Sequence, residues 1–170
     1  MAHAVVRTDK MFGTDNRTGL VTVKYYSGSG SGRGGFALDN GEVVKIEGLA
    51  TGEREVYDAT TPSVDTPIES IVLIATPEMT YCPCNYPITE FENKADALAR
   101  GYFLTPHSIF SVTKDALIGL GTPAVGNVVE LSNTTQLNVV ATATSGRTQI
   151  GKIIAVETVG KLTFYVIEVN

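Results

Sequence analysis

Short segments with β-strand patterns, separated by turn-forming residues, run through most of the sequence and limit the folds that it can adopt. Residues 20–26 read LVTVKYY, in which two sets of β-branched and aromatic side chains alternate as on a pleated strand. Roughly eight to ten short strands with almost no helical pattern predict an all-β domain, a single β-barrel or β-sandwich. The other predicted strands are residues 36–39, 42–47, 54–59, 69–77, 109–113, 127–132, 136–144, 149–159 and 161–170.

Three local patterns refine this prediction. The dipeptide Asn40-Gly41 readily adopts a tight turn, so we expect residues 36–39 and 42–47 to pair as a hairpin. The run ESIVLIATP is continuously apolar and predicts a strand covered on both faces. The closing segment KLTFYVIEVN is apolar on both faces, so it should lie centrally in a sheet or against a neighbouring molecule.

One helix is expected. Asn93 is a good capping residue, KADALAR contains good helix formers, and Gly101 is a typical helix stop. We therefore predict one short helix of about two turns, which is only long enough to connect strands.

The 170 residues are predicted to form an N-terminal arm at residues 1–18 and a single β-rich domain at residues 19–170. Within the domain, residues 27–35 read SGSGSGRGG and should form a mobile loop, because they have little side-chain volume to bury. Arg33 is the one side chain in this loop that can make a bidentate polar contact.

The charge distribution points to protein partners. The net charge of −5 argues against a nucleic-acid partner, whereas residues 1–35 carry +3 and residues 36–100 carry −8. Opposite charge on separate segments favours contacts between copies, and charged residues make up only 18% of the chain, which hints at covered surface. We expect partner contacts at four basic residues, Arg7, Lys10, Arg17 and Arg33.

No signal-peptide core or transmembrane run is visible in the sequence. We therefore expect a soluble protein that is made in a cytoplasm and has no membrane partner. The two cysteines, Cys82 and Cys84, fit a reducing compartment.

These two cysteines lie in YCPCN and could belong to a metal site, a redox pair or a structural loop. A structural zinc site needs four ligands, and the histidines that remain, His3 and His107, are not at ligand spacing. A disulfide between residues two apart is strained. We interpret the cysteines as small side chains packed under a proline-rich loop, and expect no metal.

Other candidate sites also favour a protein without catalysis or cofactor. The glycine loop lacks the lysine and the following helix of a phosphate loop. His107 and Ser108 are neighbours and do not face each other on a strand. The carboxylates between Asp39 and Asp96 could serve glycoside chemistry, but the chain has no tryptophan for sugar stacking, and acidic clusters are usually solvated or partner surfaces.

The C-terminal half resembles a known family. The stretches KADALARGYFLTPHSIFSVTKDALIG, AVGNVVELS and TSGRTQIGKIIAVETVGKLTFYVIEVN resemble the head decoration, or cement, proteins of tailed bacteriophages. The resemblance implies a β-rich virion protein on the capsid surface that binds the major capsid protein and stabilises the head without catalysis or cofactor. It also implies an assembly as trimers or as single copies at symmetry positions.

Two other functions are more consistent with the sequence than that of a thiol-dependent enzyme. A domain that binds carbohydrate or a small ligand could use tyrosine faces for stacking. Another self-assembling virion component, such as a shell or tail-tube subunit, would share the β-rich pattern. The candidate stacking residues are Tyr25, Tyr26, Tyr81, Tyr86 and Tyr102.

Overall fold

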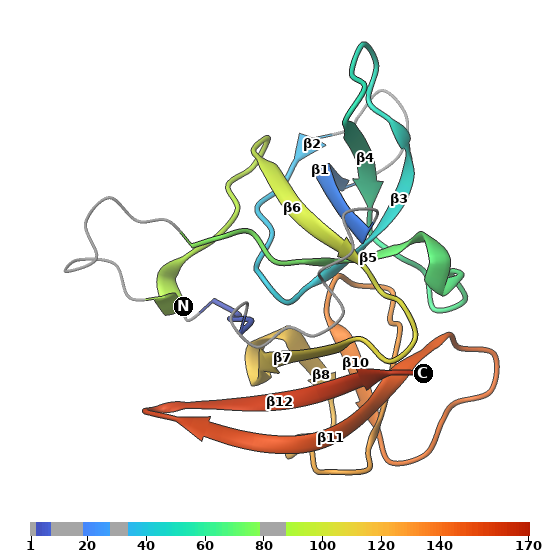
Figure 1. Cartoon of the computed structure of the whole chain (residues 1–170). Helices are drawn as coiled ribbons and strands as arrows, with labels where there is room; N and C mark the ends of the chain where they lie inside the picture. The colour runs from blue at the N-terminus through green and yellow to red at the C-terminus, as the bar shows by residue number, and fades with distance from the viewer. Residues whose placement is uncertain (1–2, 8–18, 28–33, 79–87) are drawn as a thin grey trace.

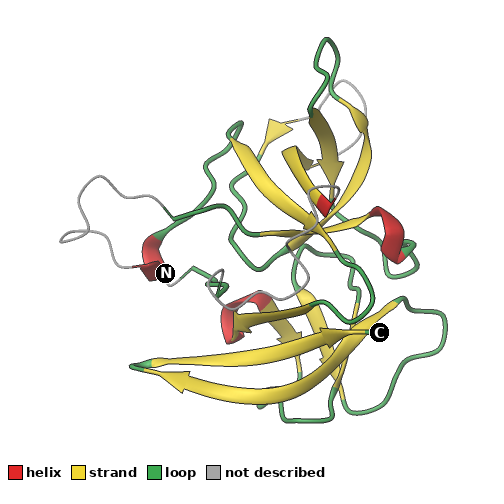
Figure 2. Ribbon diagram, viewed as in Figure 1, coloured by secondary structure: helices red, strands yellow, loops and turns green. Residues whose placement is uncertain are grey.

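The computed structural model describes residues 3–7, 19–27, 34–78 and 88–170 of the chain (Figure 1). Strands dominate these residues, and the helical pieces are three-residue turns of 3-10 helix, Ile68–Ser70, Ile88–Glu90 and Lys114–Ala116 (Figure 2). The all-β class predicted from the sequence is therefore confirmed.

The first sheet contains six strands, of which five close into a barrel. Its order is β2-β1-β4-β3-β5-β6, and β6 pairs back onto β1. The pair β1–β4 is parallel, while the other pairs are antiparallel. The bounds are β1 Leu20–Ser27, β2 Gly34–Gly35, β3 Val43–Leu49, β4 Val56–Thr60, β5 Ile71–Ile74 and β6 Leu98–Phe103.

The second sheet also has six strands, in the order β7-β12-β11-β9-β10-β8. The N-terminal residues extend it, because Val6 forms a bridge with Val112 of β7 and the Thr113 amide donates to the Val5 carbonyl at 2.9 Å. The bounds are β7 Ile109–Thr113, β8 Leu117–Gly119, β9 Val128–Glu130, β10 Leu137–Val140, β11 Gln149–Val159 and β12 Leu162–Val169.

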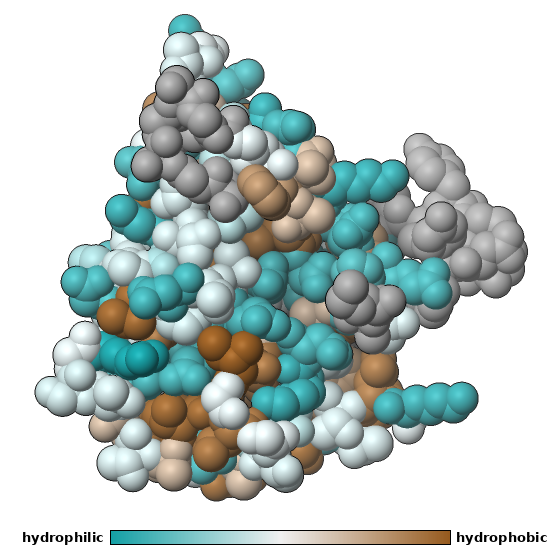
Figure 3. Space-filling model, turned by 180° about the vertical axis from the view of Figure 1, so that it is seen from behind, coloured by the Kyte–Doolittle hydropathy of each residue, from teal (hydrophilic) through white to brown (hydrophobic). Residues whose placement is uncertain are grey.

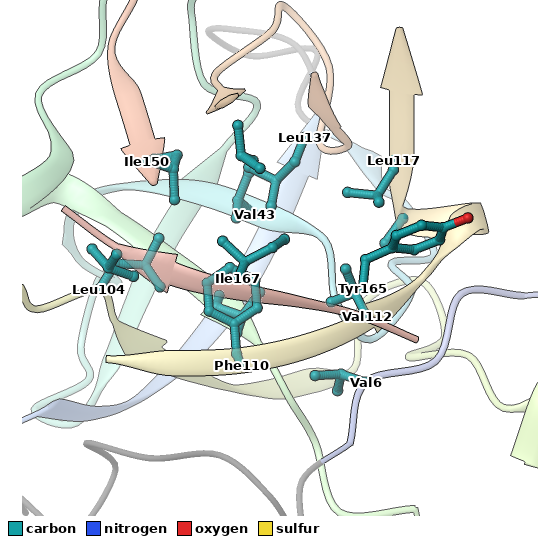
Figure 4. Packing of buried hydrophobic residues seen from close by; sticks show 14 of the residues in the cluster. Val6, Val43, Leu104, Phe110, Val112, Leu117, Leu137, Ile150, Tyr165 and Ile167 are labelled. Atoms are coloured by element: carbon teal, nitrogen blue, oxygen red, sulfur yellow. The ribbon is translucent and has the colours of Figure 1, made fainter. Parts of the chain in front are cut away.

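A shared hydrophobic core joins the two sheets. Val43 of β3 packs in one cluster with Phe110 of β7 and Ile167 of β12, and the side chains point toward one another (Figure 4). A second, smaller cluster fills the barrel and contains Val23, Val44, Ala59, Val72, Ile74, Ala99 and Leu38. The sheets therefore depend on each other for burial.

Most predicted strands form where the sequence places them. The apolar run at residues 69–77 contains β5, whose four residues are all buried, as expected for a strand covered on both faces. The closing strand β12 lies between β11 and β7, which confirms its predicted central position. The strand β8 was not predicted, because three residues are too few for a visible period.

The hairpin predicted around Asn40-Gly41 is wrong, although the turn itself forms. Gly41 has a φ of +88°, and its amide donates to the Ile74 carbonyl. The segment before the turn does not pair with β3, because Leu38 exchanges backbone hydrogen bonds with Asn93 instead. Long-range pairing has replaced the local one.

The helix predicted at residues 94–100 is also wrong, because residues 95–96 form a turn and residues 98–100 belong to β6. Asp96 has a φ of +63°, which interrupts a helix, and Asn93 uses its side-chain amide on Leu38 and Asn40 rather than as a cap. Pairing with β1 and β5 outweighs the local helix preference. About two turns of isolated helix have little stability of their own.

Candidate docking surface

The most exposed part of the second sheet is the outer half of the hairpin formed by β11 and β12. The strand β9 pairs with β11 only from Gln149 to Lys152, whereas β11 and β12 pair along to Val159 and Leu162. In Figure 1 this outer half projects away from the rest of the molecule. We call residues 154–163 the overhang.

The overhang exposes apolar side chains. Ile154, Val156 and Val159 are 40%, 43% and 48% exposed. They are exposed because the larger hydrophobic cluster does not extend to the tip of the hairpin. The residue of β12 in this cluster that lies nearest the tip is Tyr165, the cross-strand partner of Val156. Hydrophobic residues also reach the surface over the second sheet when the molecule is seen from behind (Figure 3). Val156 and Val159 are three residues apart in the strand and therefore lie on opposite faces of the hairpin, so both faces of the overhang carry exposed apolar side chains. Exposed apolar side chains are suited to contact with a partner.

Arg7 holds the root of the overhang in place. Its amide donates to the Ser111 carbonyl at 2.9 Å, which places the side chain over β12. The guanidinium carbon lies 5.7 Å from the centre of the Phe164 ring, and Nη1 lies 3.6 Å from the Glu157 carboxylate. Phe164 and Glu157 face each other across the hairpin. Arg7 therefore links the N-terminal residues to both strands of the hairpin, at Glu157 in the overhang and at Phe164 just beyond it.

Of the predicted contact residues, the structure describes Arg7, whose side chain is 15% exposed. Lys10, Arg17 and Arg33 lie outside the described residues, as do Cys82 and Cys84. In the glycine-rich loop, Gly34 and Gly35 pair with Ser27 and Tyr26, and residues 28–33 are not described. The role of these four basic residues as partner contacts stays a prediction.

A polar junction lies where the barrel meets the N-terminal residues. Asn40 is completely buried; its amide nitrogen donates to the Thr76 carbonyl at 2.8 Å and its oxygen accepts from the Thr76 amide at 2.9 Å. The Asn93 side chain donates to the same Asn40 oxygen at 3.2 Å. The His3 ring nitrogen lies 3.0 Å from the Asp39 carboxylate. These bonds join segments that are far apart in the sequence.

Two carboxylates of the polar junction are affected by burial. Desolvation raises the pKa of Glu42 above its usual value, opposed by hydrogen bonds from the Thr135 hydroxyl and the Asp39 amide. Desolvation also raises the pKa of Glu78, opposed by a hydrogen bond from Asn40. Both carboxylates accept hydrogen bonds from neighbouring parts of the chain, which tie them to the polar junction.

His107, Ser108 and Glu130 each have separate neighbours in the structure. His107 is 85% exposed and lies 3.5 Å from Glu168, whereas the Ser108 hydroxyl bonds with Thr105. Glu130 is fully buried and accepts from Asn138 and from the Thr144 amide, with Arg147 at 3.5 Å. Within the described ranges, no group of three or more histidine, cysteine or acidic side chains could hold a metal ion.

Among the hollows on the described surface of the barrel, two have volumes of about 410 and 490 Å³. Tyr57 and Phe103 help to line the first, and Lys24 and Tyr26 help to line the second. The three described tyrosines that were proposed for stacking have different surroundings. Tyr25 bonds to Thr61 through its hydroxyl, Tyr26 lies under the Lys24 ammonium, and Tyr102 packs against the larger core. Tyr81 and Tyr86 are outside the described residues.

Comparisons with family models, with curated proteins and with solved structures find no match to this chain. In the residues that the structure describes, no helix is long and apolar enough to cross a membrane. The overhang was not among the sites predicted from the sequence. Apolar residues on both faces of QIGKIIAVETV, residues 149–159, could have indicated a strand that needs a covering partner.

Proposed function

We propose that this chain is a non-enzymatic structural protein of a virion, which decorates a phage head by docking on the major capsid protein. The observation that carries the proposal is the overhang, which presents Ile154, Val156 and Val159 on a hairpin that projects beyond the core. An apolar hairpin of this kind is suited to docking on a larger body, because contact with a partner removes its side chains from water.

Two features of the sequence support the same function. Charged residues make up only 18% of the chain, which suits a protein whose surface is partly covered in its working state. The resemblance of the C-terminal half to head decoration proteins includes both strands of the overhang. Docking would stabilise the head by tying neighbouring capsid subunits together, and copies of the chain would contact one another on its surface.

The test is co-sedimentation of the full chain with capsid particles assembled from the phage's major capsid protein. The unmodified chain should sediment with the particles, and Val156→Asp should reduce the bound fraction at least tenfold. Leu49→Asp is the matched control, because Leu49 is 52% exposed but lies in the barrel, at the end of β3. Equal loss of binding for both variants, or no sedimentation of the unmodified chain, would contradict the proposal.

A further inference from the structure

The outer edge of β11 is open along the overhang. Ile153 is the last residue with a neighbour on that side, since its carbonyl accepts from the Gly126 amide and its own amide donates to the Asn127 carbonyl. From residue 154 to residue 159, no described strand pairs with this edge. An open strand edge presents backbone donors and acceptors, and the group that satisfies them all is another extended strand.

The register of the hairpin shows which backbone groups are available. Gly160 and Lys161 form a two-residue turn, so the flanking pair Val159 and Leu162 exchanges hydrogen bonds, and so does every second pair after it. The amides and carbonyls of Val156 and Thr158 therefore point away from β12, toward the open edge. An incoming strand can bond to both residues without disturbing the hairpin.

The side chains along this edge define the chemistry of the incoming strand. Ile154, Val156 and Val159 are apolar and exposed, and they lie between two exposed lysines, Lys152 and Lys161. Neither ammonium has a hydrogen bond or an ion pair with a described residue, whereas the intervening Glu157 is engaged by Arg7. The edge is thus apolar in the middle and positive at both ends.

We propose that an extended segment of the capsid protein adds to the open edge of β11 as a further β-strand. The segment is about six residues long, with apolar side chains at alternate positions and acidic residues at both ends. This inference rests on the proposed function and names the part of the partner that the overhang holds. Lysines on an edge discourage indiscriminate strand pairing, so the acidic ends give the contact its selectivity.

The probe is a blocked synthetic peptide in which valine and threonine alternate between two aspartates at each end. On titration with peptide to about millimolar concentration, hydrogen exchange at the Val156 and Thr158 amides of the full chain should slow at least tenfold. N-methylation of alternate peptide amides should abolish the effect, because it removes the backbone donors. Unchanged exchange at these two amides would overturn the proposal.

Variants of the chain separate backbone pairing from charge. Val156→Pro removes one edge donor and should abolish peptide binding, whereas Val125→Pro, in the turn at residues 124–127, should not. The double variant Lys152→Glu with Lys161→Glu leaves the backbone intact. It should bind the aspartate peptide at least tenfold more weakly and gain binding to the same peptide with lysine ends. Equal affinity of the double variant for both peptides would contradict the charge argument.

Two further outcomes distinguish the possible failures. If the edge amides of the free chain become protected as its own concentration rises, a second copy fills the edge and the inference is wrong. If Val156→Pro still sediments with capsid particles while Val156→Asp does not, strand addition is wrong but docking through the overhang stands. If the unmodified chain does not sediment at all, the proposed function itself fails.

Discussion

Asn40 connects three segments that are distant in the sequence. Both atoms of its side-chain amide bond to the backbone of Thr76, and its oxygen also accepts from Asn93. The dipeptide Asn40-Gly41 predicts the turn, because glycine readily takes the φ of +88° found at Gly41. The sequence contains no local sign of the bonds to Thr76 and Asn93, since these depend on how the barrel closes.

Replacement of Asn40 by alanine should lower the free energy of unfolding by on the order of 3 kcal/mol, because it removes two hydrogen bonds to the half-buried Thr76 backbone and one of the two acceptors of the buried Asn93 side chain. Urea unfolding at pH 7 measures the loss. Asn133→Ala is the control, because the Asn133 side chain accepts a single hydrogen bond, from Val64, at the surface. A loss for Asn40→Ala no greater than that of the control would contradict the role of the polar junction.

The raised pKa of Glu42 predicts a pH dependence of stability. Its main cause is burial, so the folded pKa lies above the usual 4.5. The contribution of this carboxyl to stability is complete below pH 4.5 and is lost as the pH rises through the folded pKa. Glu42→Gln cannot ionise, so its stability relative to the wild type should increase as the pH is raised from 4 to 7.

Denaturant unfolding of both proteins at several pH values tests this expectation. The exposed variant Glu53→Gln removes one negative charge from the barrel surface and corrects for the change in net charge. A difference between Glu42→Gln and the wild type that stays constant across the pH range would show that Glu42 does not titrate as described.

The element β6 shows where local sequence rules fail. KADALAR favours a helix by propensity, but Gly101 lies buried between β1 and β5, and Val72 occupies the space that a side chain at position 101 would need. Gly101, which the sequence pattern predicts to end a helix, lies instead within the barrel strand β6, where close packing leaves no room for a side chain. This distinction depends on which strands become neighbours, and no window of the sequence contains that information.

Gly101→Ala should lower the free energy of unfolding by about 1–3 kcal/mol, because the new methyl group overlaps the Val72 side chain. Val72→Ala makes room and should recover part of the loss. A double-mutant cycle measured by urea unfolding tests the pair. Strictly additive losses for the two substitutions would mean that the two side chains do not compete for space.

The hairpin of β11 and β12 depends on Arg7 for part of its rigidity. Arg7→Ala removes the ion pair with Glu157 and the contact with the Phe164 ring. Because the Glu157 side chain is 39% exposed, the ion pair contributes about 1 kcal/mol or less, and the ring contact adds a similar amount. Amide exchange in residues 155–165 should therefore become severalfold faster.

Hydrogen exchange of the free chain measures this effect, and added salt should reduce the difference between Arg7→Ala and the wild type. Exchange in β9 serves as the internal control, because the contacts of Arg7 described above are with β7, β11 and β12. Equal acceleration in β9 and in the overhang would point to a global loss of stability instead of a local role in the hairpin.

At the scale of the whole molecule, the strand pattern predicts the all-β class. The apolar character of both faces of the closing strand predicts a place within a sheet or against a neighbouring molecule, and β12 lies within the second sheet. The candidate site was less predictable. The sequence of β11 shows that Val156 and Val159 are apolar, but it does not show that they are exposed. Both residues lie in the part of β11 beyond Lys152, where pairing with β9 has ended. That endpoint belongs to the sheet, and the residues of β11 alone do not determine it.

The overhang and the acidic segment lie in different parts of the fold. Residues 36–100, which carry a charge of −8, contain three of the five barrel strands and the first half of β6, whereas the overhang projects from the second sheet (Figure 1). Docking through the overhang would therefore leave the acidic barrel accessible to solvent or to the basic residues of neighbouring copies. The orientation on a particle is thus a direct consequence of the proposal.

Electron microscopy of decorated capsid particles, at a resolution that separates the two sheets, tests this central claim most directly. The account predicts that residues 154–163 lie against the capsid protein, with an added strand beside β11 and with the barrel directed away from the shell. Density that places the barrel on the shell and leaves the hairpin of β11 and β12 in solvent would contradict it.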